Sequence, residues 1–299
     1  MRIERWVEQV TLLPAVAAPP AAGCAATTIC DIYRELDSHP DLRPGPRVDE
    51  LFSRLVRLVI STPDEQAADI LGDPVVRGLT PRLRELCARG EFELETFWAD
   101  TIAAGEDPHA ELARFPYLEN YQLLCRMELD AVTKAVQRPI RSMAFAGSGP
   151  LPLSSLVLAQ ELGITIDNLD HNPGAVDTSR RLAARLRLDN LRVHAADVAA
   201  ADLSRYDVVI LAALVGSSPA EKAAVLRRIS VSMSPGAVLL IRSARGLRTL
   251  LYPEVDPQAI DGFEVLDVIH PSGEVINSAI LARVTGTAAV PGPRNGMEH

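Results

Sequence analysis

The chain has 299 residues, of which 47% are hydrophobic, and it carries a formal net charge of −9. A chain of this length and hydrophobicity can bury a large core in one or two domains. The acidic balance and the aromatic content of 4% argue against a nucleic-acid partner, because such proteins usually present a basic surface and stacking rings. No apolar run reaches 18 residues, so we expect no membrane span.

The cysteines and the first residues favour a cytoplasmic protein. The four cysteines show no Cys-x-x-Cys spacing, so we expect reduced thiols and no zinc or redox site. Residues 10–24 are apolar and end in Ala-Ala-Gly-Cys, which faintly resembles a lipoprotein cleavage site. However, Glu4 and Glu8 stand where a signal peptide carries basic residues, and prolines interrupt the apolar run. Export is therefore disfavoured.

Residues 1–137 predict an N-terminal helical domain. Apolar residues recur there at helical spacing in four segments: 27–36, 48–60, 80–104 and 115–136. Thr80 followed by Pro81 is typical of a helix start, so we expect the third helix to begin at this point. Residues 62–65 and 106–109 are proline-containing and predict turns.

Residues 138–285 predict a second domain, in which short apolar strands alternate with helices. This alternation indicates an α/β fold, with a parallel sheet covered by helices on both faces. The expected strands are 141–146, 163–169, 191–195, 206–213, 236–242, 262–269 and 275–284. The expected helices are 152–162, 175–186 and 219–232.

The last two predicted strands are joined by His-Pro-Ser-Gly-Glu and form a hairpin. A mostly parallel sheet with an antiparallel edge hairpin resembles the Rossmann-like domain of the class I S-adenosylmethionine (SAM) transferases. Residues 286–299 are rich in glycine and proline, so we expect a disordered tail.

The stretch AFAGSGPLPLSS, residues 144–155, connects the first predicted strand to the next helix. Ligands of open parallel sheets bind at the carboxyl ends of the strands. Glycines in such a loop permit positive φ and a close approach of the backbone, although a plain strand–helix turn has the same pattern. The residues that we expect to bind the ligand here are Gly147, Ser148, Gly149, Leu151 and Pro152.

Polar or small residues also end the next three strands. Asp170 follows the glycines by just over 20 residues, where a carboxylate accepts hydrogen bonds from ribose hydroxyls. Asp197 and Val198 end the third strand, where we expect contact with an adenine. Ala212 and Leu214 at the fourth strand end suit the wall of an adenine or methionine pocket. Each aspartate alone is equally typical of a helix cap, but together these residues favour an adenosine compound.

Among adenosine compounds SAM fits better than NAD or ATP. Pro152 occupies the position of the third glycine in the dinucleotide pattern, and no Gly-Lys-Ser/Thr follows for the phosphates. SAM carries a sulfonium and no phosphate, so it does not need a helix N-terminus crowded with amides.

Several segments resemble the nicotianamine synthases, and the similarity runs in order from about residue 25 to 285. The matching segments are LETFWA (94–99), FPYLENYQLL (115–124), AFAGSGPLPLSSLVLAQELG (144–163), YDVVILAALVG (206–216), SPGAVLLIRSARGLRTLLYPEVD (234–256) and GFEVLDVIHPSGEVINSAILAR (262–283). The resemblance implies an enzyme that transfers the 3-amino-3-carboxypropyl (aminobutyrate) arm of SAM to an amine and releases 5′-methylthioadenosine. It implies no metal cofactor, and a product that serves as a metallophore.

Alternatives stay open at this point. Within the family, three transfers from SAM give nicotianamine, whereas one transfer onto histidine or another amino acid leads to opine metallophores. Outside it, an ordinary SAM methyltransferase or a SAM- or metallophore-binding regulator fits the same sheet. The expected partners are SAM and an amino-acid acceptor, with a homodimer as a candidate assembly.

The resemblance also implies the catalytic groups, and with them a role for the N-terminal domain 1–137 as a lid that covers the substrate. Glu95, in Leu-Glu-x-x-Phe/Trp-Ala, is the expected general base, because a carboxylate with a raised pKa in a partly dry pocket can take the proton of an α-amine. Tyr117 and Tyr121 are expected to orient the acceptor, and Tyr33 matches a tyrosine of an early helix in the family. The alternatives are a surface charge for Glu95 and core packing for the tyrosines.

Both reacting molecules carry carboxylates, so a basic partner is expected. Arg242, at the end of the fifth predicted strand, is the first candidate for binding them, and Tyr252 is a further candidate. Surface salt bridging is the alternative for Arg242.

Overall fold

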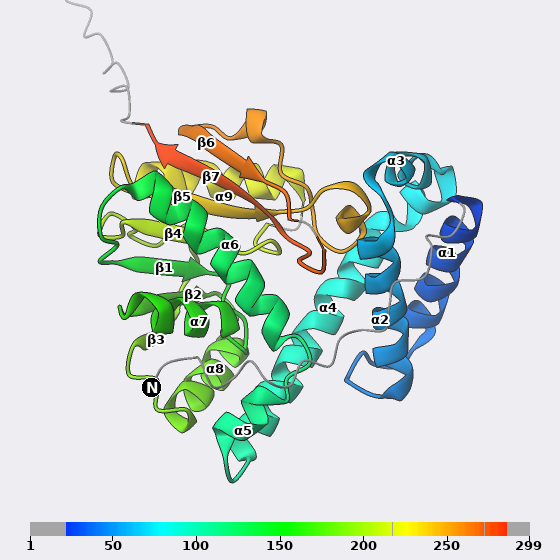
Figure 1. Ribbon diagram of the computed structural model, residues 1–299, viewed down its shortest axis with the longest axis horizontal. Helices are drawn as coiled ribbons and strands as arrows, with labels where there is room; N and C mark the ends of the chain where they lie inside the picture. Colours follow the sequence, from blue (N-terminus) through cyan, green and yellow to red (C-terminus); the bar gives the residue numbers. More distant parts are fainter. Residues whose placement is uncertain (1–21, 217, 272, 286–299) are drawn as a thin grey trace, which may run out of the picture.

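The computed structural model describes residues 22–285 except residues 217 and 272. A seven-stranded sheet forms one half of the molecule, and a group of helices stands beside it (Figure 1). The strand order is β3-β2-β1-β4-β5-β7-β6. The strands are β1 (Met143–Ala146), β2 (Ile166–Asp170), β3 (Leu191–Ala195), β4 (Val208–Leu211), β5 (Val238–Ser243), β6 (Phe263–Ile269) and β7 (Ser278–Val284).

Strands β1 to β5 pair in parallel, whereas β7 pairs antiparallel with both β5 and β6. The predicted α/β class and its antiparallel edge hairpin are therefore confirmed. The central strands are apolar throughout because both of their faces are buried. In β1, Met143 and Phe145 join the core on one face, while Ala144 and Ala146 join the core on the other.

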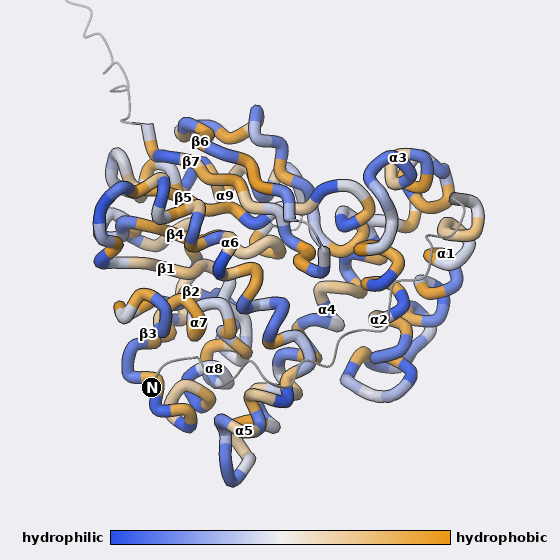
Figure 2. The backbone as a smooth tube through the Cα atoms, viewed as in Figure 1, coloured by the Kyte–Doolittle hydropathy of each residue, from blue (hydrophilic) through white to orange (hydrophobic). Residues whose placement is uncertain are grey.

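Helices cover both faces of the sheet. One face packs against α6 (Leu118–Val136), α7 (Leu153–Leu162) and α8 (Pro173–Arg185), and the other packs against α9 (Pro219–Ser232). Figure 2 shows hydrophilic residues interspersed with hydrophobic ones along these helices. Helix α7 is the most enclosed of them, because every residue from Leu153 to Ala159 is buried.

The N-terminal helices form a second core. They are α1 (Ala22–Ser38), α2 (Pro46–Ser61), α3 (Asp64–Gly72) and α4 (Pro74–Ala104). Leu247 and Leu250 of the short 3-10 helix η2 (Gly246–Leu250), which follows β5, pack into the same cluster. The last turns of α4 bury Ala99 and Ile102 in the core of the sheet half instead. Helix α4 therefore links the two halves (Figure 1).

Helix α4 begins earlier than the sequence predicted. Asp73 caps it, since its carboxylate accepts the amides of Val75 (2.8 Å) and Val76 (3.2 Å). The prediction of a start at Thr80 and Pro81 was wrong: the Thr80 hydroxyl donates to the Val76 carbonyl at 2.7 Å, and Pro81 lies inside the helix. The short helices α3 and α5 (Pro108–Ala113) were not predicted, because their first residues were interpreted as turns.

The predicted boundary between residues 137 and 138 falls in the connection from α6 to β1. Helix α6, however, packs on α7, β5 and β7 rather than in the N-terminal bundle. The division into domains at this position stays a prediction. Most of the segment 10–24 and the predicted tail 286–299 lie outside the described residues.

All four cysteines are free; Cys87 and Cys125 are buried, whereas Cys24 is exposed. Within the described part of the chain, no helix combines the length and the apolarity that a membrane crossing requires.

Candidate active site

A cavity of about 630 Å³ opens at the carboxyl ends of β1, β2, β4 and β5, and α4 and α6 close it from the side of the helices. This volume is in the range of pockets that bind small molecules. Of the predicted ligand-binding residues, the cavity lining brings together Gly147, Ser148, Gly149, Leu151, Pro152, Asp170, Asp197, Ala212 and Leu214. Val198 is not among the lining residues, since it is buried in the core on the α9 face.

The loop after β1 adopts a conformation that requires glycine at two positions. Gly147 has φ +78° and Gly149 has φ +66°, both in the left-handed region. A Cβ atom at Gly149 would overlap the Glu95 carboxylate, and one at Gly147 would overlap the Val215 side chain. Gly149 therefore allows the Glu95 side chain to lie directly against the loop.

Asp170 fixes this loop to the end of β2. Its carboxylate accepts the amides of Gly149 and Asn172, each at 2.9 Å. A carboxylate has about four acceptor sites, so it can still accept hydroxyl groups from a ligand.

A buried lysine holds the loop after β4 through a hydrogen bond to its backbone. The Lys222 ammonium donates to the Ala213 carbonyl at 2.9 Å, and burial lowers the pKa of Lys222 to about 8. Ala212 and Leu214, which the sequence predicted as pocket residues, are thereby held at the cavity wall.

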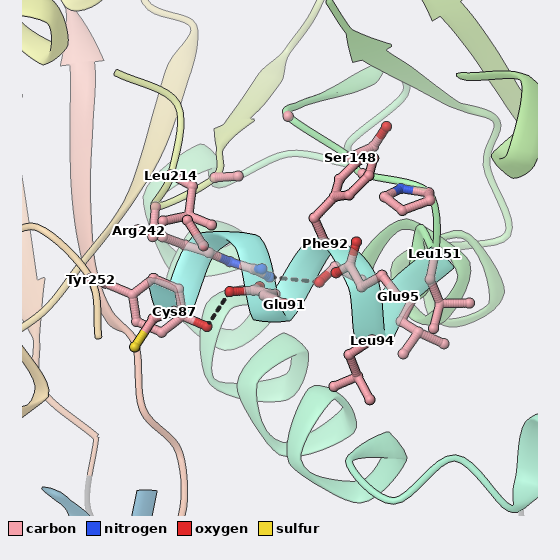
Figure 3. Close-up of a pocket in the computed structure, with 18 of the residues that line it drawn as sticks. Cys87, Glu91, Phe92, Leu94, Glu95, Ser148, Leu151, Leu214, Arg242 and Tyr252 are labelled. Atoms are coloured by element: carbon pink, nitrogen blue, oxygen red, sulfur yellow. Dashed lines mark hydrogen bonds between the residues drawn. The ribbon is translucent and has the colours of Figure 1, made fainter. Parts of the chain in front are cut away.

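Two carboxylates project from α4 into the cavity (Figure 3). Glu91 and Glu95 are four residues apart and so lie on one face of the helix. The Tyr252 hydroxyl donates to Glu91 at 2.9 Å, and the Tyr121 hydroxyl lies 3.4 Å from a Glu95 oxygen. Each carboxylate therefore has a phenol partner from outside α4.

The enclosure of these groups shifts their protonation. Desolvation in the cavity raises the pKa of Glu95 well above its ordinary value, and the like charge of Glu91 raises it further. The Leu151 amide and the Tyr121 hydroxyl, which hydrogen-bond the carboxylate, oppose this shift. Desolvation also raises the pKa of Tyr121 well above its usual range, so this phenol keeps its proton and acts as a donor. Glu95 is thus a carboxylate that accepts a proton more readily than a solvated one.

Arg242 lines the cavity, but another protein group already compensates its charge. Its Nε and Nη2 donate to Glu128 at 2.7 and 2.9 Å, and Nη2 also donates to the Ser154 hydroxyl at 2.8 Å. Arg242 and Glu128 are both buried. Through these hydrogen bonds Arg242 connects β5 to α6 and α7. The sequence predicted that Arg242 binds substrate carboxylates and did not predict this structural role.

The predicted tyrosines differ in position. Tyr117, Tyr121 and Tyr252 line the cavity. Tyr33 packs instead against the core of the N-terminal bundle and is not among the lining residues. The structure therefore does not bring Tyr33 to this site.

Three residues of interest were missed from the sequence. Glu91 had a signal, because its spacing of four from Glu95 places both on one helix face. Glu128 also had one, since it occupies the apolar stripe of α6 formed by Leu124, Cys125, Ala131 and Val132. Asn277, which is buried in the lining, had no local signal. No group of three or more metal-binding side chains occurs among the described residues.

Comparison with known proteins adds independent findings. A family model described as nicotianamine synthase protein matches residues 22–289. Nicotianamine synthase 3 of Oryza sativa subsp. indica is 41% identical over 271 residues, which cover 87% of this chain and 78% of that protein. Nicotianamine synthase 9 of Hordeum vulgare is 44% identical over 254 residues, covering 82% and 74% respectively.

The fold is also similar to solved structures. A crystal structure of MtNAS in complex with MTA and tNA aligns with a TM-score of 0.78 at 25% identity, covering 87% of this chain and 98% of that chain. A crystal structure of a mutant of MtNAS in complex with S-adenosylmethionine aligns with a TM-score of 0.76 at 24% identity, with the same coverage of both chains.

Proposed function

The chain belongs to the nicotianamine synthase family, and from this premise we propose that it makes nicotianamine from SAM. In each transfer an amine nitrogen attacks Cγ of the aminobutyrate arm. The Cγ–S bond breaks, its electron pair stays on sulfur, and the neutral thioether 5′-methylthioadenosine leaves. The nitrogen gives up one proton as the new C–N bond forms.

The cavity residues suit SAM as the substrate. Asp170 retains acceptor sites for ribose hydroxyls, and Asp197 lines the cavity where an adenine amino group would need an acceptor. The Ser148 hydroxyl is buried in the glycine loop and has no hydrogen-bond partner in the protein. A buried hydroxyl without a partner is unfavourable, so it suits the polar amino-acid end of SAM.

The observation that carries the mechanism is the position of Glu95 against Gly149. It places a carboxylate with a raised pKa beside the loop that would hold the methionine part of SAM. At neutral pH an α-amine is mostly protonated, so attack needs a nearby base. We assign that role to Glu95, with Tyr121 as the donor that orients its carboxylate.

Further parts of the proposal concern the product and the cell. A product with several amines and carboxylates is a chelator of transition metals, so we assign it the role of a metallophore. The free thiols favour a cytoplasmic location. A homodimer remains a prediction.

The test is mass spectrometry of the purified enzyme with SAM alone, and then with SAM plus single amino acids such as L-histidine or D-histidine. We expect methylthioadenosine and nicotianamine from SAM alone. Methylthioadenosine that forms only with an added acceptor would replace this proposal with a one-step transferase. Release of S-adenosylhomocysteine instead would indicate a methyltransferase and contradict the proposal.

The pH dependence of turnover is expected to shift in Glu91→Gln. Glu95 acts as a base only when ionised, so kcat/KM should fall as the pH drops through its raised pKa. Removal of the Glu91 charge lowers the pKa of Glu95, and the acid limb of the profile should move to lower pH by about one unit. The measurement is the pH profile of methylthioadenosine release.

Glu93→Gln is the matched control, because Glu93 lies on the same helix but is not among the cavity residues. Its acid limb should coincide with that of the wild type. An unmoved limb in Glu91→Gln, or one displaced to higher pH, would show that the two carboxylates are not coupled as described.

A further inference from the structure

The Asn277 side chain is a buried polar group that the protein itself leaves unsatisfied. Asn277 directly precedes β7, is 8% exposed and lines the cavity, and its Nδ2 has no hydrogen-bond partner. An unpaired buried amide costs free energy, so its retention needs a partner from outside the chain. Nδ2 is a donor and therefore suits an acceptor atom on a ligand.

The segment before Asn277 is held in place from two sides. The Asn120 side chain on α6 donates to the Glu274 carbonyl at 2.7 Å. Arg248 in η2 donates to the carbonyls of Gly273 at 3.1 Å and Val275 at 3.4 Å. These bonds hold the backbone just before Asn277 in place without a ligand, which lowers the entropic cost of binding.

The sheet places Asn277 away from the glycine loop. Ser278 pairs with Ser243 at the end of β5, so Asn277 lies at the carboxyl end of that strand. The glycine loop follows β1, and β4 separates β1 from β5 in the sheet. Asn277 therefore lies two strands away from the glycine loop, beyond the end of β4 that carries Ala212 and Leu214.

The charge of the lining indicates what the amide binds. Among the described lining residues the cationic candidates are Arg242 and His171, and the His171 side chain is largely exposed to solvent. Arg242 uses Nε and Nη2 on Glu128 and Ser154. An acceptor that carries a carboxylate into this cavity thus needs a further donor.

We infer that Asn277 binds a carboxylate oxygen of the acceptor and so selects amino acids over simple amines. The inference rests on the proposed function, because that function supplies an acceptor with a carboxylate. In the first transfer this is the amino-acid end of a second SAM molecule, and in later transfers it is a carboxylate of the growing product.

The test compares the wild type with Asn277→Leu, which keeps a similar size but has no donor. The loss of one hydrogen bond to a charged group should lower kcat/KM for methylthioadenosine release by about tenfold to a hundredfold, mainly through KM. Calorimetry should show unchanged binding of methylthioadenosine, which has no carboxylate. Nicotianamine titrated into methylthioadenosine-saturated enzyme should bind about tenfold more weakly or worse.

Two further variants make the comparison specific. Asn277→Ser retains a donor and should recover part of the lost affinity. Asn190→Leu is the matched control, since Asn190 lies at the opposite end of the strands, before β3, and should match the wild type. Unchanged nicotianamine binding in Asn277→Leu would overturn the inference, as would an equal loss of methylthioadenosine binding. A wild type that releases no methylthioadenosine would refute the proposed function instead, while the nicotianamine titration still decides the role of Asn277.

Discussion

Glu95→Gln is expected to bind SAM as the wild type does and to release almost no methylthioadenosine. Glutamine keeps the shape of the side chain and an oxygen that can accept from Tyr121 and the Leu151 amide. It cannot take up the proton that the attacking amine must lose. Loss of a general base lowers the rate by about a hundredfold to ten-thousandfold. The measurements are methylthioadenosine release by chromatography and SAM affinity by calorimetry.

The control for this prediction is again Glu93→Gln, which changes a charge of the same helix away from the cavity. It should retain wild-type turnover. A Glu95→Gln enzyme that turns over at the wild-type rate would exclude Glu95 as the base. A variant that loses SAM affinity together with turnover would show that Glu95 supports the glycine loop rather than the proton transfer.

The sheet half could be predicted from the sequence because its signals are local. Each central strand is a short apolar run between turn residues, and the hairpin of β6 and β7 is marked by its connection. The N-terminal half was harder. The length of α4 depends on the Asp73 cap and on packing that tolerates Pro81 inside the helix, which outweighs the usual preference of proline for a first turn.

In the candidate site, too, the residues with a local sequence signal could be predicted and the others could not. The glycine loop, Asp170 and the helix with Glu95 carry recognisable patterns, and the structure brings them to one cavity. What the sequence did not show is pairing over long separations. Glu128 and Arg242 are 114 residues apart, so nothing local indicates that the arginine is already bound. That the Asn277 side-chain amide has no hydrogen-bond partner can be recognised only from the three-dimensional structure.

Glu128→Gln is expected to cause the largest loss of stability. Glu128 is 0% exposed and holds the Arg242 guanidinium through two hydrogen bonds between α6 and β5. Glutamine leaves the buried arginine charge without a counter-charge, and breaking a buried pair in this way costs about 3–5 kcal/mol. Denaturant unfolding of wild type and variant, followed by circular dichroism, measures the difference.

The double variant Glu128→Leu/Arg242→Met separates the charge from its surroundings. With both charges gone, no uncompensated ion is buried, and replacement of a buried pair by apolar residues is often close to neutral. We therefore expect the double variant to be more stable than Glu128→Gln. Equal stability of Glu128→Gln and wild type would contradict the pairing as the source of stability. If the double variant folds and keeps its SAM affinity and turnover, Arg242 only links β5, α6 and α7 structurally. If it folds but loses affinity for nicotianamine, Arg242 also binds a substrate carboxylate, because a variant that still folds would have lost only the direct contact between Arg242 and nicotianamine.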